Sequence, residues 1–121
     1  MEKEKKTKGQ LESEICEALI QFEKEYMGRG PKESNTYIIE DMVLVRLKGV
    51  LTPAEHKLAI SEEGADLIKR TRVQLLENGR TLLEKIIVDI VGCGVKSLHS
   101  DISVKTGERV IIFILDQSDI V

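Results

Sequence analysis

The motif Gly28-Arg29-Gly30-Pro31 is the first place in this sequence where chemistry could occur. Exposed backbone amides at its two glycines, together with the Arg29 guanidinium, could hold a phosphate or a carboxylate. A Walker loop follows a strand, has four residues between its glycines and continues with Lys-Ser/Thr, whereas this motif follows a predicted helix. We therefore favour a structural interpretation, in which a left-handed glycine and a proline end that helix.

His99 and Asp101 lie two residues apart, on the polar face of a predicted strand. With Cys93 or His56 they could form a metal or acid–base site. No short-spaced ligand set accompanies them, so we favour a solvated strand face and predict no metal, no cofactor and no catalytic residue. The alternative is a small-ligand or anion-binding module, possibly an enzyme, whose residues would be Gly28, Arg29, Gly30, His99 and Asp101.

The composition narrows the classes of function. Of the 121 residues, 41% are apolar and only 3% are aromatic, which indicates a packed but aliphatic core. The net charge of −3 argues against binding to nucleic acid, and acidic neighbours dilute a small basic patch of Lys69, Arg70 and Arg72. Two cysteines make no disulfide framework. No apolar run approaches the ~20 residues of a membrane-spanning helix, so we expect a cytoplasmic protein without direct membrane insertion.

Helical spacing of apolar residues predicts a first helix over residues 11–27, with Leu19, Phe22 and Tyr26 among its core-facing residues. A β segment follows over residues 36–47. The pair Glu40-Asp41 divides it, either as a hairpin turn or as a bulge in one long strand, and we favour the hairpin.

Thr52-Pro53-Ala54-Glu55 is typical of a capping box and predicts a short helix. The long apolar pattern over residues 62–91 then predicts a helix of roughly 45 Å, which exceeds the size of so small a domain. Either Gly79 interrupts this helix, or its end protrudes and packs on another chain.

The last segment predicts a hairpin with strands over residues 95–104 and 110–115. The second strand is apolar on both faces, so we expect it to be central and covered on both sides. These elements indicate an α+β fold in two layers, with the order α-β-β-α-α-β-β, an antiparallel sheet of about four strands and one long helix packed on it. We expect a flexible N-terminus over residues 1–10, a single domain over 11–116 and a tail over 117–121.

Both the excess helix length and the two-sided apolar strand predict self-association, because exposed apolar area is a liability and a homodimer is the simplest cover. The predicted interface residues are Leu75, Leu82, Ile86, Ile112 and Ile114.

A family resemblance adds a biological context. The runs that carry it are Glu25-Tyr26-Met27-Gly28-Arg29-Gly30-Pro31, Tyr37 before an apolar strand, Leu51-Thr52-Pro53-Ala54-Glu55, His99-Ser100-Asp101-Ile102 and Thr106-Gly107-Glu108-Arg109-Val110. In this order they resemble the MpsC-type family, over residues 11–115. The family is named for a sodium-translocating, membrane-potential-generating system. The resemblance implies an accessory protein that docks on subunits of a membrane transport complex from the cytoplasmic side, and it implies no catalytic residue.

Overall fold

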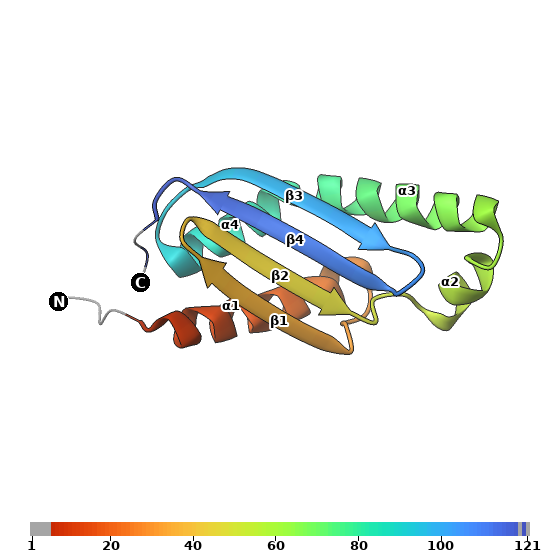
Figure 1. Ribbon diagram of the computed structural model, residues 1–121, viewed down its shortest axis with the longest axis horizontal. Helices are drawn as coiled ribbons and strands as arrows, with labels where there is room; N and C mark the ends of the chain where they lie inside the picture. The colour runs from red at the N-terminus through yellow and green to blue at the C-terminus, as the bar shows by residue number, and fades with distance from the viewer. Residues whose placement is uncertain (1–5, 119, 121) are drawn as a thin grey trace.

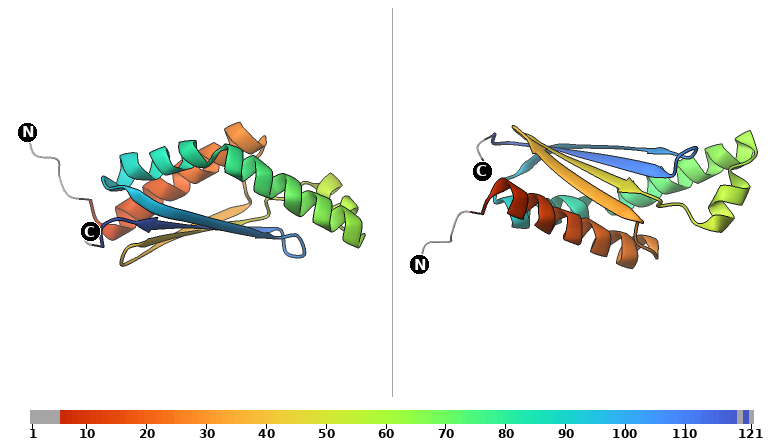
Figure 2. Two further views of the ribbon diagram at one scale, coloured as in Figure 1. Left: turned by 90° about the horizontal axis from the view of Figure 1, so that it is seen from above. Right: turned by 60° about the horizontal axis from the view of Figure 1, so that its bottom comes forward.

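The computed structural model describes residues 6–118 and 120, and there the helices lie on one face of a four-stranded antiparallel sheet (Figures 1 and 2). The order of the strands in the sheet is β1-β2-β4-β3. The predicted α+β class and the order of the elements are confirmed. No helix formed by the described residues lies on the opposite face of the sheet (Figure 2).

A capping box starts α1 (Lys8–Phe22), in which the backbone N–H of Gln10 donates to Thr7 Oγ1 at 3.1 Å and Thr7 N–H donates to Gln10 Oε1 at 2.8 Å. The helix therefore begins three residues before the predicted Leu11. Part of the predicted flexible N-terminus, residues 1–5, lies outside the described residues, as do 119 and 121 of the predicted tail. Leu11, Ile15, Leu19 and Phe22 are buried, as their spacing predicts.

The helix continues as one wide turn, η1 (Glu23–Met27), with π-helical geometry. Gly28 ends it in the left-handed conformation, at φ 94°, which confirms the predicted helix stop. Tyr26 was expected in the core, but it is exposed and stacks on Phe22 with their ring centroids 5.0 Å apart. The wider turn departs from the 3.6-residue period on which that expectation rested.

The hairpin prediction is also confirmed. Strands β1 (Glu33–Ile39) and β2 (Met42–Lys48) pair in antiparallel fashion around the two-residue turn Glu40-Asp41. Strand β4 (Glu108–Leu115) lies between β2 and β3 (Val95–Ser103), so the strand that is apolar on both faces is central, as predicted.

Three helices connect the two hairpins: α2 (Pro53–Leu58), α3 (Glu62–Asn78) and α4 (Arg80–Val91). Gly79 separates α3 from α4, so of the two predicted alternatives the interruption at Gly79 is the one observed, and the one long helix expected on the sheet is two helices. A Cβ at Gly79 would lie 3.0 Å from the Phe22 ring, which shows how closely the end of α1 approaches this junction. Helix α2 and the start of α3 nevertheless extend past the end of the sheet (Figure 1).

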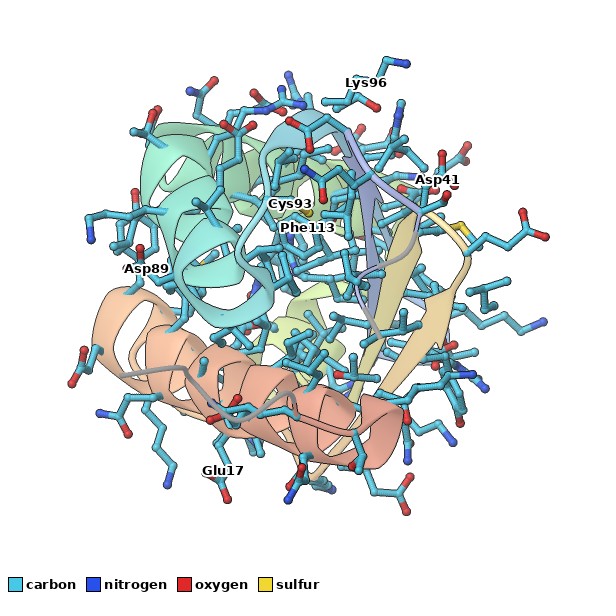
Figure 3. The ribbon with its side chains drawn as sticks, turned by 90° about the vertical axis from the view of Figure 1, so that its left-hand side faces the viewer. Glu17, Asp41, Asp89, Cys93, Lys96 and Phe113 are labelled. Carbon is cyan, nitrogen blue, oxygen red and sulfur yellow. The ribbon has the colours of Figure 1, made fainter. Side chains whose placement is uncertain are left out.

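The core fills the space between the helices and the inner face of the sheet, and Phe113 lies within it (Figure 3). It is mainly aliphatic, as the composition predicts. The strands contribute alternate residues to it, among them Val43, Val45 and Leu47 from β2 and Ile111, Phe113 and Leu115 from β4.

Candidate functional site

Arg72 is buried in α3, on the same helical row as Ile68 and Leu76. Its Nη2 donates to Glu55 Oε1 at 2.6 Å and to the Val50 carbonyl at 3.0 Å, and its Nε donates to Glu55 Oε2 at 2.9 Å. The prediction that Arg72 belongs to an exposed basic patch is therefore wrong. The Arg72 guanidinium, aided by the Thr52 N–H, lowers the pKa of Glu55 to about 2.

A second pair of opposite charges, Glu23 and Arg109, is buried more deeply, with side chains only 2% exposed. Arg109 Nε lies 4.0 Å from Glu23 Oε1, which is too long for a hydrogen bond, and Arg109 Nη2 donates to the Arg72 carbonyl at 3.3 Å. Burial raises the pKa of Glu23 and lowers the pKa of Arg109, while their mutual attraction acts in the opposite direction on each. Loss of hydration therefore outweighs the attraction at this distance.

The two pairs form one electrically balanced chain, Glu55–Arg72 and Arg109–Glu23, between α2, α3, η1 and the inner face of β4. A cavity of about 20 Å³ beside Arg109 and Ser100 has room for about one water molecule. Both oxygens of Glu23 and Arg109 Nε are buried without a hydrogen-bond partner among the described residues. The hydrogen-bonded Glu55–Arg72 pair is therefore the part of this group that braces α2 against α3, and the cavity offers no space for a substrate.

Neither Glu23 nor Arg109 was predicted to be a buried charge. Glu23 continues the four-residue spacing of Leu11, Ile15 and Leu19, and Arg109 precedes the inward-facing Ile111 by two positions. These spacings alone could have indicated that both charged side chains point into the core.

The predicted ligand residues lie in two places. Arg29 Nη1 donates to the Leu51 carbonyl at 3.0 Å and Arg29 Nη2 to the Gly49 carbonyl at 3.4 Å, which ties the loop containing Gly28 and Gly30 to the connection after β2. His99 and Asp101 lie on β3, the edge strand opposite the β1 strand that follows this loop. The structure thus does not bring the two groups together.

On β3, His99 Nε2 lies 3.1 Å from Ser97 Oγ, and Asp101 Oδ1 lies 3.4 Å from Lys69 Nζ. Both side chains are on the outer face of the sheet, as the alternation predicts. Across the part of the chain that the structure describes, no group of three or more His, Cys, Asp or Glu side chains could hold a metal ion.

The outer face of the sheet has an apolar half. Two rows of residues run across three paired strands: Tyr37, Leu44 and Ile112 form one row, and Ile39, Met42 and Ile114 form the next. Tyr37 is 43% exposed and Ile39 is 48% exposed. We call these six residues the outer sheet patch.

A second apolar surface lies on the other side of the molecule. A groove of about 410 Å³ runs between α1 with η1 and α4, and its apolar lining consists of Ala18, Phe22, Tyr26, Leu82 and Ile86. We call it the helical groove. The residues predicted for a single interface are thus divided: Ile112 and Ile114 belong to the outer sheet patch, Leu82 and Ile86 line the helical groove, and Leu75 is exposed on α3.

Within the described residues, no helix has the length and apolar character needed to cross a bilayer. A family model described as "Na+-translocating membrane potential-generating system (MpsC)" matches residues 7–117.

The chain belongs to the MpsC family. It is similar to the uncharacterized protein YbcI of Bacillus subtilis (strain 168), with 50% identity over 109 residues that cover 90% of this chain and 88% of YbcI. It is also similar to the uncharacterized protein YrhF of the same organism, with 26% identity over 108 residues that cover 86% of each chain. No solved structure matches this MpsC-family chain.

The Glu55–Arg72 pair predicts a pH-dependent contribution to stability. Because folding lowers the pKa of Glu55 from 4.5 to about 2, its ionised form stabilises the fold above pH 4.5, and this contribution is lost as the pH falls toward 2. Glu55→Gln should lower the free energy of unfolding at pH 7 by about 2 kcal/mol and flatten the decline below pH 4.5. Urea unfolding at several pH values measures both effects. The control Glu17→Gln, on an exposed residue, should follow the wild type, and an acid limb unchanged in Glu55→Gln would contradict the assignment.

The two interpretations of Arg29 predict different results for Arg29→Ala. If its hydrogen bonds to Gly49 and Leu51 are structural, the substitution should lower the free energy of unfolding by about 1 kcal/mol, equally with and without phosphate. The anion-binding alternative expects phosphate to raise the Tm of the wild type and the substitution to abolish that rise. Thermal unfolding in matched buffers, with the exposed Arg70→Ala as control, distinguishes them.

Proposed function

We propose that this MpsC-family protein is a non-enzymatic accessory protein that self-associates, binds partner proteins and serves a membrane-potential-generating system from the cytoplasmic side. The observation that carries the proposal is the outer sheet patch, which none of the helices in the described part of the chain covers (Figure 2). Exposed apolar area of this kind gains roughly 25 cal/mol per Å² when it is buried, so a partner surface should cover it.

The edges of the sheet favour contact through its face. On β1, the backbone N–H of Ile38 donates to Glu12 Oε2 at 2.8 Å, and the Cys16 thiol donates to the Ser34 carbonyl at 3.6 Å. On β3, Arg80 Nη2 donates to the Leu98 carbonyl. Because side chains occupy these backbone groups, a second chain would have to displace them in order to add a strand.

The charges on the other half of the outer face are compensated within the chain. Arg46 Nε lies 2.8 Å from Glu108 Oε2, and Lys48 Nζ lies 3.4 Å from Glu33 Oε2. This half therefore needs no oppositely charged partner, and two copies related by a two-fold axis could bring their apolar halves together.

The available area is consistent with a weak dimer. Four strands about 4.8 Å apart, with a rise of about 3.3 Å for each of about eight residues, present roughly 500 Å² of face. Only contact over the whole face, with the charged half as well as the apolar half, would bury roughly 1,000 Å² in two copies together, near the lower limit for a specific interface. We therefore expect association at micromolar concentrations.

A charge placed in the outer sheet patch should separate the copies. Ile112→Lys puts an ammonium group between Leu44 and His99 on the outer face, where a face-to-face dimer would have to desolvate it. We expect the wild type to be dimeric at tens of micromolar and the dimer dissociation constant of the variant to rise at least about tenfold. Light scattering across a dilution series measures this change.

Ile60→Lys is the matched control, because Ile60 is exposed between α2 and α3, away from the sheet. It should associate as the wild type does. A wild type that stays monomeric at these concentrations, or an Ile112→Lys variant as dimeric as the control, would contradict self-association through this face.

The link to a membrane system predicts a specific partner. The tagged chain, recovered from membranes dissolved in mild detergent, should bring an integral-membrane ion-transport subunit with it. The same purification with Ile112→Lys and Ile60→Lys would show whether that capture requires the outer sheet patch. Recovery of the chain alone from cells that contain the system would argue against the accessory function.

A further inference from the structure

The helical groove is distinct from the outer sheet patch and lies on the opposite layer of the molecule. Helices α1 and α4 form its two walls and run antiparallel, because Phe22 near the end of α1 approaches Gly79 just before α4, while Leu11 and Ile90 line a common hollow at the other end. Two antiparallel helices with an open seam between them offer the ridges and grooves into which a third helix packs.

The apolar side chains of the groove suit such a helix. Phe22 and Tyr26 stack on one wall, and Leu82 on the other wall is 48% exposed although it lies beside buried Leu83. Ala18 is small, so it lets a visiting side chain come close to α1. The groove is thus an apolar hollow lined over about two turns of α1 with η1 and about one turn of α4, which suits a few apolar side chains of an amphipathic helix.

The charged side chains beside the groove indicate which charge a bound partner should carry. Glu25 of η1 lines the groove, whereas Glu17 on α1 points away from α4 (Figure 3). Gln21, which is neutral, donates to Glu25. On α4, Lys85 Nζ lies 3.0 Å from Asp89 Oδ2, so that cation is already compensated. Among the described residues that line the groove, Glu25 is therefore the one charged side chain, and it is complementary to a partner with Lys or Arg beside its apolar stripe.

We propose that the helical groove binds a basic amphipathic helix from a cytoplasmic segment of a membrane protein. Such segments carry an excess of Lys and Arg, which suits Glu25, whereas the same carboxylate would repel an anionic lipid surface. The choice of a membrane protein as the source rests on the proposed function, while the helical shape, the apolar stripe and the positive charge rest on the groove alone.

The test uses the full chain and a labelled synthetic peptide of about 18 residues, with leucines at helical spacing and lysines elsewhere. A peptide with the same leucines and with glutamates in place of the lysines, and vesicles of phosphatidylglycerol, are the comparison probes. At physiological salt we expect micromolar binding of the Leu/Lys peptide by fluorescence anisotropy and no binding of the Leu/Glu peptide or the vesicles.

Three variants locate the binding on the surface. Leu82→Lys should weaken binding of the Leu/Lys peptide at least about tenfold, and Glu25→Lys about threefold. Leu67→Lys is the matched control, because Leu67 is 49% exposed on α3 outside the groove, and it should bind within about twofold of the wild type. Equal binding of the two peptides, equal losses in Leu82→Lys and Leu67→Lys, or binding to vesicles alone would overturn the inference.

Light scattering on the same variants separates this inference from the proposed function. If Leu82→Lys remains dimeric while the peptide fails to bind the wild type, the groove inference is wrong and self-association stands. If Leu82→Lys separates the copies, a second copy of this chain occupies the groove, and the inference is also wrong. If the wild type is monomeric and binds the Leu/Lys peptide through Leu82, the groove inference stands and self-association is wrong.

Discussion

The central strand of the sheet has two apolar faces and the fold provides helices for only one of them. On β4, Arg109, Ile111, Phe113 and Leu115 point toward the helices and are buried, while the alternate residues Val110, Ile112 and Ile114 remain partly exposed. Alternation in a β-strand sends neighbouring side chains to opposite faces, so no local rearrangement can bury both sets. The open outer face is therefore a consequence of the topology.

The covered face contains two buried charge pairs that differ in their hydrogen bonding. Glu55 and Arg72 satisfy each other through two hydrogen bonds, and Arg72 also reaches the Val50 carbonyl ahead of α2. Glu23 and Arg109, 4.0 Å apart, attract each other without a hydrogen bond, and both lose their hydration. The first pair therefore stabilises the junction of α2 and α3. The Glu23–Arg109 pair places a charged residue of η1 next to one of strand β4.

Local signals in the sequence were sufficient for most of the fold. The capping box at Thr52, the turn at Glu40-Asp41 and the helix stop at Gly28 depend on a few adjacent residues, and all three are confirmed. Gly79 left two alternatives open, because a glycine weakens a helix without always ending it. The structure shows the break, and there the rings of Phe22 and Tyr26 come so close that a side chain would crowd them.

The candidate sites could be predicted only in part, because they depend on which face each element presents to the others. Arg72 was assigned to the surface on the basis of its charge, although its spacing from Ile68 and Leu76 placed it in the core. Leu82 and Ile112 were assigned to one interface on the basis of their apolar character, yet the layer arrangement sets them on opposite sides. Residue type alone does not show whether an apolar residue lies on the helix-covered face of the sheet or on its outer face.

The outer sheet patch and the helical groove lie on opposite sides of the molecule, so a partner on one need not block the other. A single partner on the outer sheet patch leaves the helical groove accessible, because the sheet and the core lie between them. If both surfaces bind as proposed, one chain holds two partners at once.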